Sequence, residues 1–438
     1  MHQNLLEILE AREARAARQK ELLRQYGKPL VCFTMNIPGP VKVSPLITRG
    51  FQYGCRLLRA LPALHREQRC TAAGWEGFWV VDAPAEDIKK LCAHIEDHDP
   101  MGRVFDMDVL TARGEKCSRA QLGLPVRKCL LCKQDAMVCS RSRAHSLEAL
   151  QAETFRLIGQ GLQEALAETA VKALLCELYA TPKPGLVDQA NSGSHQDMDL
   201  FTFLRSAAAL WPYFRGCADI GLTESDPQSV MAALRKAGKE AEEAMFRATG
   251  GVNTHKGAIF SMGILCGAAA MLMPEQWESP EAVAAQCQRL TEGLCARDFA
   301  GITPETARTF GEKLYALQGI TGARGQAEAG FPAAWQVGLP ILEAGLAGRI
   351  SWNDSLCAAL LHILAATQDT NLIKRGGRHI QDRVRVLLKE TPYPGSDALE
   401  DLDGEFIAAG LSPGGSADLL AATCFFYFLK TPNHLTTA

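Results

Sequence analysis

The sequence lacks a marked excess of charge of either sign. Its 46 Lys and Arg residues against 49 Asp and Glu residues give a formal net charge of −3. A protein that holds nucleic acid on a broad basic face carries a clear positive excess. The composition therefore argues against a nucleic-acid partner, while a local basic pocket for a phosphorylated small molecule stays open.

Long hydrophobic runs are also missing. The longest apolar stretch, Ala258 to Met273, is shorter than the about 20 residues that a membrane-spanning helix needs. Ser261, Gly263 and Gly267 interrupt it. We therefore expect no contact with a membrane, and we expect this stretch to form a buried helix.

The chain does not start with an apolar leader, because Met1 to Glu21 is charged throughout. Disulfides are rare in reducing compartments, so the 15 cysteines predict mostly reduced thiols in a cytoplasmic protein. A free cysteine packs as a small hydrophobic residue, and most of these are expected to fill the core.

The sequence itself has two textures. Strand-like runs at 30–35, 77–82 and 104–110 alternate with amphipathic segments at 49–60 and 86–98. Later segments are rich in Ala, Leu and Glu at helical spacing, at 146–180, 200–213, 228–249, 280–297, 304–318, 352–366 and 416–430. We predict two domains: α+β over residues 1–150 and all-α helical over residues 151–438.

An acidic pair marks the first domain. Asp106 and Asp108 lie two apart in a predicted strand, so their carboxylates share one face and could clamp Mg²⁺ for phosphoryl or nucleotidyl transfer. Arg103 and Lys42 are nearby candidates for holding phosphate. The alternative is the solvent face of an edge strand.

A cysteine and histidine cluster follows. Its spacing is Cys129-x2-Cys132-x6-Cys139-x5-His145, which fits a tetrahedral zinc site of the closed, structural kind. The alternative is a set of reduced, partly buried thiols.

Five glycine-punctuated polar blocks mark the second domain, at 181–188, 251–257, 322–328, 369–377 and 412–418. A glycine lets the backbone approach a ligand, and a charged or amide side chain beside it can hold phosphate or metal. Their joint occurrence predicts one polyphosphate-handling site assembled from several loops.

Several of these blocks have simpler explanations. Asp197 and Asp199 precede a predicted helix, where acids are favoured electrostatically. Arg324 and Glu328 are one helical turn apart and could form a surface ion pair. Ser416 could be a helix N-cap.

The ordered blocks resemble two known families. Six segments are similar to motifs of triphosphoribosyl-dephospho-CoA synthase: Thr181 to Asp188, Asn191 to Asp199, Gly251 to Gly257, Gly322 to Glu328, Asp369 to Gly377 and Ser412 to Leu420. Pro38 to Lys42, Gly102 to Leu110, Leu124 to Cys132 and Val138 to Arg141 resemble apo-citrate lyase phosphoribosyl-dephospho-CoA transferase. The chain resembles a fusion of the two. Gln189 and Gln326 depart from the charged residues expected there.

The resemblance implies two reactions. In the second domain the ribose 2′-hydroxyl of 3′-dephospho-CoA attacks the anomeric carbon of ATP, and adenine leaves while the triphosphate is kept. In the first domain the phosphoribosyl-dephospho-CoA unit is moved onto a serine of the acyl carrier (gamma) subunit of apo-citrate lyase, and pyrophosphate leaves. Mg²⁺ is the implied cofactor.

Attack at an anomeric carbon needs a base, electrostatic support for the transition state and a held triphosphate. The expected phosphate and substrate binders are Lys183, Asn253, Lys256, Arg324, Arg375, Gly414, Gly415 and Ser416. The base or Mg²⁺ ligand is left open among Asp188, Asp197, Asp199, His255 and Asp369. In the first domain Asp106 and Asp108 act in catalysis and hold Mg²⁺, with Lys42 and Arg103 on phosphate.

Two rival functions stay open. One is a non-catalytic scaffold that binds CoA-like nucleotides and a carrier protein, although such a binder would not need both Asp106 and Asp108. The other is the equivalent enzyme of a malonate decarboxylase pathway, which uses the same prosthetic group. The citrate-lyase-like first half favours citrate lyase.

Overall fold

The computed structural model describes residues 5–375 and 378–431. They fall into two compact units, one up to Glu164 and one from Ala165 onward. This division lies within helix α5 (Leu147–Tyr179), and so does the predicted domain boundary at 150/151, which stays a prediction.

The first unit is built on a five-stranded antiparallel sheet with the order β2-β3-β1-β4-β5. Its strands are β1 (Leu30–Met35), β2 (Ala63–Thr71), β3 (Gly74–Val81), β4 (Phe105–Leu110) and β5 (Lys116–Cys117). Its helices, besides the start of α5, are α1 (Leu5–Tyr26), α2 (Pro45–Leu57), α3 (Ala85–His98) and α4 (Ala136–Ser142). The described unit is therefore α+β, in agreement with the prediction.

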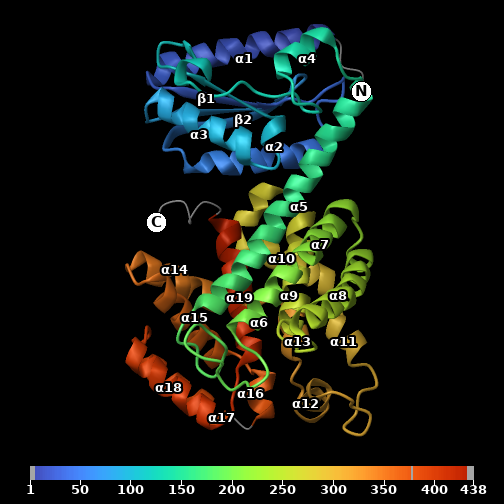
Figure 1. The fold of residues 1–438 in the computed structure, drawn as a ribbon, viewed down its shortest axis with the longest axis vertical. Helices are drawn as coiled ribbons and strands as arrows, with labels where there is room; N and C mark the ends of the chain where they lie inside the picture. Colours follow the sequence, from blue (N-terminus) through green and yellow to red (C-terminus); the bar gives the residue numbers. More distant parts are fainter. Residues whose placement is uncertain (1–4, 376–377, 432–438) are drawn as a thin grey trace. The chain divides into compact units, whose positions relative to one another are not determined.

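Helices cover both faces of this sheet (Figure 1). On one face α1 packs Leu22 and Leu23 against Leu30 and Cys32 of β1. On the other face α2 packs against Phe33, which stacks on Phe51 with ring centroids 5.0 Å apart. Because side chains alternate along a strand, the even-numbered residues of β1 face α1.

The strands predicted at 30–35, 77–82 and 104–110 are found, as are both helices. The sequence did not indicate α1, β2 or β5. Strand β2 has charged residues at Arg66, Glu67 and Arg69, and its residues alternate between exposed and half-buried. A strand without a buried apolar face gives little of the hydrophobic periodicity on which the prediction depends.

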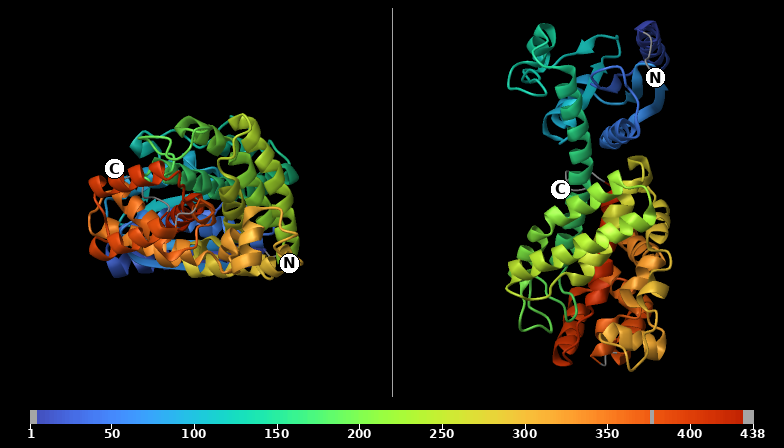
Figure 2. Two further views of the ribbon diagram at one scale, coloured as in Figure 1. Left: turned by 90° about the horizontal axis from the view of Figure 1, so that it is seen from below. Right: turned by 90° about the vertical axis from the view of Figure 1, so that its right-hand side faces the viewer.

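The described part of the second unit consists of helices and turns, without a strand (Figures 1 and 2). After α5 come α6 (Leu200–Ala209), α7 (Trp211–Thr223), α8 (Pro227–Thr249), α9 (Lys256–Met271), α10 (Pro280–Thr291), α11 (Leu294–Asp298), α12 (Phe310–Gln318) and α13 (Gly322–Glu328). The last are α14 (Leu339–Ala347), α15 (Trp352–Ala366), α16 (Thr370–Lys374), α17 (Arg378–Glu390), α18 (Ser396–Ala408) and α19 (Gly414–Lys430).

Two helices form the centre of this unit. Helix α9 packs against α7, α8, α10 and α19, and α19 also packs against α15. Both are buried along most of their length, and the apolar stretch predicted to be a buried helix is α9. None of the described helices combines the length and apolar composition that crossing a membrane requires.

Three predicted helices differ in their bounds for local reasons. The segment at 200–213 is two helices, because Pro212 lies in the first turn of α7 and has no N–H for the preceding turn. The segment at 280–297 breaks at Gly293, whose φ is 67°. The segment at 304–318 becomes helical only after Thr309, which forms a capping box with Glu312.

Candidate functional sites

A cavity of about 860 Å³ lies in the second unit. It draws lining residues from segments 186–187, 194–198, 253–258, 319–326, 366–375 and 412–421. Parts of all five glycine-punctuated blocks therefore border one space. Asn253, Gly414 and Gly415, which were predicted to bind substrate, are among the lining residues.

Two long helices begin at this cavity. Lys256 is the first residue of α9 and Gly414 is the first residue of α19. The first N–H groups of a helix have no carbonyl partner within the helix, and the helix dipole adds partial positive charge there. The two helix starts therefore favour an anion in the cavity.

Three cationic side chains also line the cavity: Lys256, Lys374 and Arg375. Lys256 Nζ lies 2.7 Å from Glu242 Oε2, and Arg375 Nη1 donates to the carbonyl of Gly410 at 2.8 Å. Lys374 was not predicted. A bound polyphosphate could displace the Glu242 carboxylate from Lys256, because surface ion pairs are weak.

Asp369 joins the starts of two helices. As the N-cap of α16 it accepts from the N–H groups of Asn371 and Leu372 at 2.9 and 3.1 Å. Its other oxygen accepts from the N–H and hydroxyl of Ser416 at 2.7 and 2.9 Å. Burial raises the pKa of Asp369, although these donors oppose the shift. Asp369 thus fixes α16 against α19.

The prediction that Ser416 is a helix N-cap is wrong. Helix α19 begins at Gly414 with Pro413 as its N-cap, so Ser416 is the third residue of the helix. Its hydroxyl is buried and donates to Asp369. Its role as a phosphate binder stays a prediction.

Asp188 closes the loop after α5. Its carboxylate accepts from the N–H groups of Lys183, Ala190 and Asn191 at 2.8, 2.7 and 3.1 Å. Asp188 is 2% exposed and is not one of the residues that line the cavity. Its surroundings are those of a carboxylate that shapes a turn.

A second carboxylate, Asp403 on α18, holds the same loop. It accepts from the N–H of Gly185 and from Asn191 Nδ2, both at 2.8 Å. Gly185 has φ of 70°, and a Cβ there would lie 2.2 Å from the carbonyl oxygen of Leu411. Asp403 could not be predicted from its sequence neighbours, because its partners Gly185 and Asn191 are more than 200 residues away in the chain.

Lys183 is 1% exposed and forms an ion pair with Glu177 of α5. Of these two residues, Glu177 borders the cavity and Lys183 does not. Desolvation raises the pKa of Glu177, while the Lys183 charge lowers it. The predicted role of Lys183 in phosphate binding stays a prediction, and its position is that of a buried counter-ion.

Arg324 does not line the cavity. Its Nε donates to Asp298 Oδ2 at 2.7 Å, and Glu328 accepts from the N–H of Cys295 instead. The alternative of an Arg324–Glu328 surface pair is therefore wrong. Gln326, in contrast, does border the cavity.

His255 borders the cavity and is 3% exposed. Its Nδ1 lies 2.7 Å from the Ser206 hydroxyl, and its buried Nε2 has no hydrogen-bond partner among the described residues. Burial, and then the charge of Lys183, lower the pKa of His255 to about 3. The imidazole is therefore neutral at physiological pH.

His195 and Asp197 follow the loop that Asp188 closes. His195 Nε2 is 2.9 Å from the Ser412 hydroxyl, and both His195 and Asp197 line the cavity. Asp199 is the N-cap of α6, where it accepts from the N–H and hydroxyl of Thr202. The Mg²⁺ role of both acids stays a prediction.

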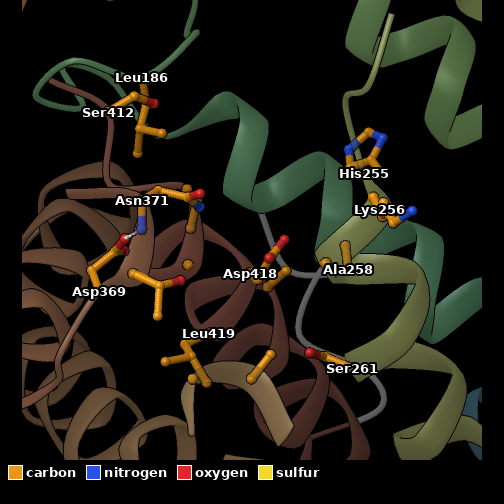
Figure 3. A pocket seen from close by; sticks show the side chains of 18 of the residues that line it. Leu186, His255, Lys256, Ala258, Ser261, Asp369, Asn371, Ser412, Asp418 and Leu419 are labelled. Atoms are coloured by element: carbon orange, nitrogen blue, oxygen red, sulfur yellow. Dashed lines mark hydrogen bonds between the residues drawn. The ribbon is translucent and has the colours of Figure 1, made fainter. Parts of the chain in front are cut away.

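Asp418 is an acid at the cavity that the sequence analysis did not assign a role. It is the fifth residue of α19, and in the close-up view it lies between Asp369 and Ala258 (Figure 3). Burial, and then the neighbouring charges of Glu177 and Asp369, raise its pKa well above the ordinary value. A Cβ at Gly257 would lie 1.9 Å from Asp418 Oδ2, so this approach requires glycine.

In the first unit Asp106 and Asp108 share a face of β4, as predicted. Burial, and then Asp108, raise the pKa of Asp106. Lys116 Nζ lies 2.7 Å from Asp108 Oδ1, and Arg127 Nη1 lies 3.8 Å from Asp106 Oδ1. The pair is therefore flanked by two cations on a strand that lies between β1 and β5, and the side chains of Asp106 and Asp108 are 42% and 37% exposed.

A third acid lies on the same face. Thr34 of β1 is opposite both Asp106 of β4 and Glu76 of β3, and residues opposite one another across strands point to one side. Glu76 is fully buried and accepts from Arg15 and Arg69. Glu76 could not be predicted as part of this site, because strand register, and not its sequence neighbours, places it on the same face as Asp106.

The predicted phosphate binders of this unit are half-buried. Burial, and then Arg12, lower the pKa of Lys42, whose ammonium donates to the carbonyl of Ile37. Burial, and then Arg127, lower the pKa of Arg103. Both roles stay predictions.

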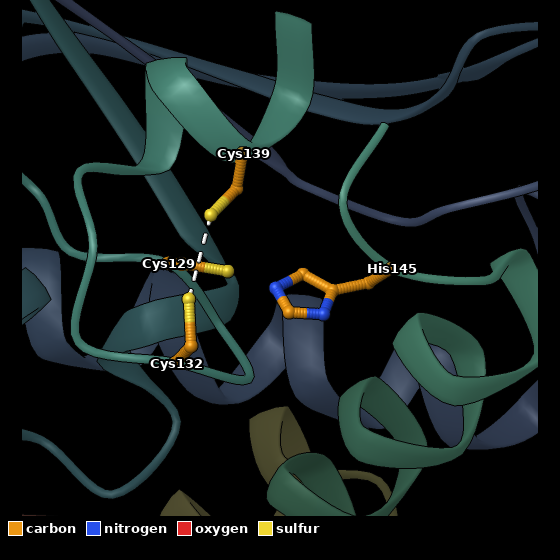
Figure 4. A group of neighbouring side chains, drawn as sticks. All are labelled: Cys129, Cys132, Cys139 and His145. Carbon is orange, nitrogen blue, oxygen red and sulfur yellow. Dashed lines mark hydrogen bonds between the residues drawn. The ribbon is translucent and has the colours of Figure 1, made fainter. Parts of the chain in front are cut away.

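The side chains of Cys129, Cys132, Cys139 and His145 converge, as Figure 4 shows. Their ligand atoms all lie within 4.8 Å of one another. Burial opposes ionisation of Cys129, but the N–H groups of Leu131 and Cys132 lower its pKa to about 7. The buried Nε2 of His145 has no hydrogen-bond partner among the described residues.

The two parts of the chain match two different protein families. Residues 163–437 match the family model described as ATP:dephospho-CoA triphosphoribosyl transferase. Residues 3–160 match the model described as apo-citrate lyase phosphoribosyl-dephospho-CoA transferase.

Relatives are similar over the whole chain. "Protein CitXG" of Haemophilus influenzae is 35% identical, over 96% of this chain and 95% of the relative. "Protein CitXG" of Leuconostoc mesenteroides subsp. cremoris is 32% identical, over 96% of both chains. A "2-(5''-triphosphoribosyl)-3'-dephosphocoenzyme-A synthase" of Haemophilus ducreyi is 40% identical, over 68% of this chain and 99% of the relative.

A two-unit chain in which each half matches a transferase family is a multifunctional transferase. It belongs to the family of fused proteins that join an apo-citrate lyase phosphoribosyl-dephospho-CoA transferase to an ATP:dephospho-CoA triphosphoribosyl transferase.

Proposed function

We propose that this enzyme both makes and attaches the prosthetic group of citrate lyase. In the second unit the 2′-oxygen of 3′-dephospho-CoA forms a bond to the anomeric carbon of ATP, and the bond from that carbon to adenine breaks. The hydroxyl proton passes to a base, and adenine leaves with a proton. The 5′-triphosphate stays on the product.

The observation that carries this proposal is the single cavity at the starts of α9 and α19, lined by Lys256, Lys374 and Arg375. Backbone N–H groups and three cations suit the retained triphosphate. The volume of about 860 Å³ lies within the range of cofactor sites.

Asp418 is the base in this proposal. Asp188 and Asp369 give their oxygens to backbone donors, and a carboxylate with several donors is a weak base. The imidazole of His255 is also a weak base, because burial holds its pKa at about 3. Asp418 borders the cavity, and burial and its acidic neighbours raise its pKa, which makes its carboxylate a stronger base than that of an ordinary aspartate.

His255 has a different role. Its neutral Nε2 is buried at the cavity and has no partner in the described part of the chain, so it could donate to or accept from the substrate once Ser206 fixes the tautomer. We assign it to substrate positioning, through hydrogen bonding rather than proton removal.

In the first unit the serine oxygen of the acyl carrier subunit attacks the α-phosphorus of the triphosphate. The bond to the bridging oxygen breaks and pyrophosphate leaves, while the serine proton is released. Asp106 and Asp108 would hold Mg²⁺, which would neutralise charge on the phosphates. Their one-sided placement beside Lys116 and Arg127 supports an anionic substrate here.

Adenine release tests the synthase half. Incubation with ATP, Mg²⁺ and 3′-dephospho-CoA should yield adenine on chromatography, together with a product that keeps the triphosphate. Asp418→Asn should reduce the rate by about 10²–10⁴-fold, the usual contribution of a general base. Asp401→Asn, at an exposed position on α18, is the matched control and should leave the rate unchanged. Absence of adenine with the wild-type enzyme would refute the proposal.

The same incubation separates the enzyme from a non-catalytic scaffold. A scaffold would bind dephospho-CoA without releasing adenine and without adding mass to the carrier subunit. The match of the first half to an apo-citrate lyase family favours citrate lyase over a malonate decarboxylase pathway.

A further inference from the structure

The segment from Arg127 to His145 folds into a small hairpin followed by one short helix. The N–H of Cys129 donates to the carbonyl of Gln134 at 2.7 Å, and the N–H of Ala136 donates to the carbonyl of Arg127 at 2.9 Å. These bonds turn the chain back on itself, so Cys129 and Cys132 lie at the tip of a hairpin, one on each side of Leu130 and Leu131.

The rest of the cluster is brought back by α4. Cys139 lies on this helix and faces the hairpin, with its Sγ 3.4 Å from Cys132 Sγ. The helix ends at Arg143, whose φ of 50° is left-handed, and the N–H of Ala144 returns to the carbonyl of Cys139. This reversal sends His145 toward the three thiols (Figure 4).

We propose that Cys129, Cys132, Cys139 and His145 bind one Zn²⁺ in a closed, four-coordinate structural site. Tetrahedral zinc with Zn–S bonds of about 2.3 Å places its sulfur ligands about 3.8 Å apart. Four donor atoms within 4.8 Å of one another need only small shifts to reach that arrangement.

Two features of the cluster favour a metal over a thiol cluster without one. His145 Nε2 is buried and has no partner among the described residues, although a buried polar nitrogen usually has one. The N–H groups of Leu131 and Cys132 also point at Cys129 Sγ, where they would stabilise a thiolate ligand.

The zinc would fix Arg127 at the acidic site of the first unit. Arg127 begins the hairpin two residues before the first ligand, and its Nη2 donates to the carbonyls of Gly102 and Arg103 at 3.2 and 3.1 Å. Its Nη1 lies 3.8 Å from Asp106 Oδ1. The hairpin is also closed by its own backbone bonds and by the Lys128–Asp135 ion pair, so without the metal we expect Arg127 to be held less firmly but not released.

Metal analysis of the full-length, tag-free enzyme tests the site without an activity assay. The wild type should hold one zinc per chain by mass spectrometry after gel filtration, and Cys132→Ser should lose at least nine-tenths of it. Cys70→Ser, which changes an exposed cysteine on β2 outside the cluster, is the matched control and should retain the full content.

Cobalt substitution identifies the ligands even if a serine variant fails to fold. Co²⁺ in the wild type should show sulfur-to-cobalt charge transfer and the intense visible bands of a tetrahedral site. His145→Cys should keep one metal per chain and shift those bands, because four sulfurs replace three sulfurs and a nitrogen. An unchanged spectrum would overturn the assignment of His145.

Two results would overturn the whole proposal. One is wild-type enzyme that carries less than about one zinc in ten chains after growth and purification with zinc present. The other is a Cys132–Cys139 disulfide found by peptide mapping in enzyme purified without reductant. Neither result would bear on adenine release, which belongs to the other unit.

Discussion

Three carboxylates of the second unit share one chemistry and differ in their partners. Asp188 and Asp369 accept hydrogen bonds from several donors and hold turns and helix starts together. Asp418 instead faces the cavity beside two other acids. At the scale of single residues, Asp188 and Asp369 each accept from several donors, whereas the N–H of Ala258 donates to Asp418, which we propose as the base.

Asp418 gives the synthase a pH dependence of definite sign. An ordinary aspartate has a pKa of about 3.9. Because the pKa of Asp418 is raised above that value, its carboxyl group stays protonated over a wider acidic range. Adenine release should fall as pH is lowered through that raised pKa. A pH–rate profile of kcat/KM measures the acidic limb. An acidic limb that persists in the residual activity of Asp418→Asn would assign it to another group.

The same residue should lower stability at neutral pH. The pKa of this carboxyl group is higher in the folded protein than in the unfolded chain. Its contribution to stability is therefore fully present below the unfolded-state pKa and is lost as the pH rises through the folded-state pKa. Asp418→Asn should therefore be more stable than the wild type at neutral pH and show a flatter stability profile. Urea unfolding at acidic and neutral pH checks both. A variant less stable at neutral pH would contradict this prediction.

Lys183 should matter for folding more than for substrate binding. Lys183→Met leaves the buried carboxylate of Glu177 without its counter-ion, which typically costs about 3–5 kcal/mol. Denaturant unfolding measures the loss, and adding Glu177→Leu should restore most of it. Unchanged stability with a raised KM for ATP would instead support Lys183 as a phosphate binder.

Sequence alone located some of these residues and not others. The Cys129–His145 cluster could be predicted because its members are close in the chain. The contact between Asp418 and Gly257, and the one between Asp403 and Gly185, depend on how distant helices pack. Arg324 lies outside the cavity lining, and its phosphate-binding role stays a prediction, because a glycine-rich sequence does not show on which side of the helix its neighbours lie.

At the scale of elements, α9 and α19 meet where both begin. Their separation at this point is set by the missing side chain of Gly257, which leaves room for Asp418. Apolar periodicity predicted the bodies of both helices. It gave the start of α19 two residues late, because Gly414 and Gly415 are poor helix formers that tertiary contacts nevertheless keep helical.

Gly257→Ala tests this contact. Alanine is the better helix former, so any loss must come from displacing Asp418. We expect adenine release to fall by about 100-fold, the scale on which misplaced catalytic groups reduce rates. Gly216→Ala in α7, where a Cβ meets nothing within 4 Å, is the control. It should keep full activity and gain up to about 1 kcal/mol in stability. Full activity of Gly257→Ala would exclude a close role for Asp418.

At the scale of the whole molecule, each unit has its own core and its own acids. The sequence predicted two domains, because the period of the apolar residues and the frequency of strand-forming residues both change along the chain. They could not give the α1 helix or the paired faces of the sheet. Those depend on which apolar residues meet after folding.

Independent sites predict separable defects. Asp106→Asn should release adenine at a rate within about twofold of the wild type and add no mass to the carrier subunit, because each site belongs to its own unit and substitutions that share no partners act nearly additively. Asp418→Asn should fail to release adenine. Mixing the two variants should restore mass gain on the carrier, measured by intact-protein mass spectrometry. Mixed variants that never modify the carrier would mean that the intermediate does not pass through solution.

The anion-binding groups at the starts of α9 and α19 have a consequence for evolution. Many of them are main-chain N–H groups, which every amino acid except proline carries. Alanine scanning of Lys256, Lys374 and Arg375 should therefore underestimate how firmly a triphosphate is held. We expect the pocket to keep its ligand when its side chains are substituted during evolution. Substitutions that unwind the first turns of α9 and α19 should weaken binding most.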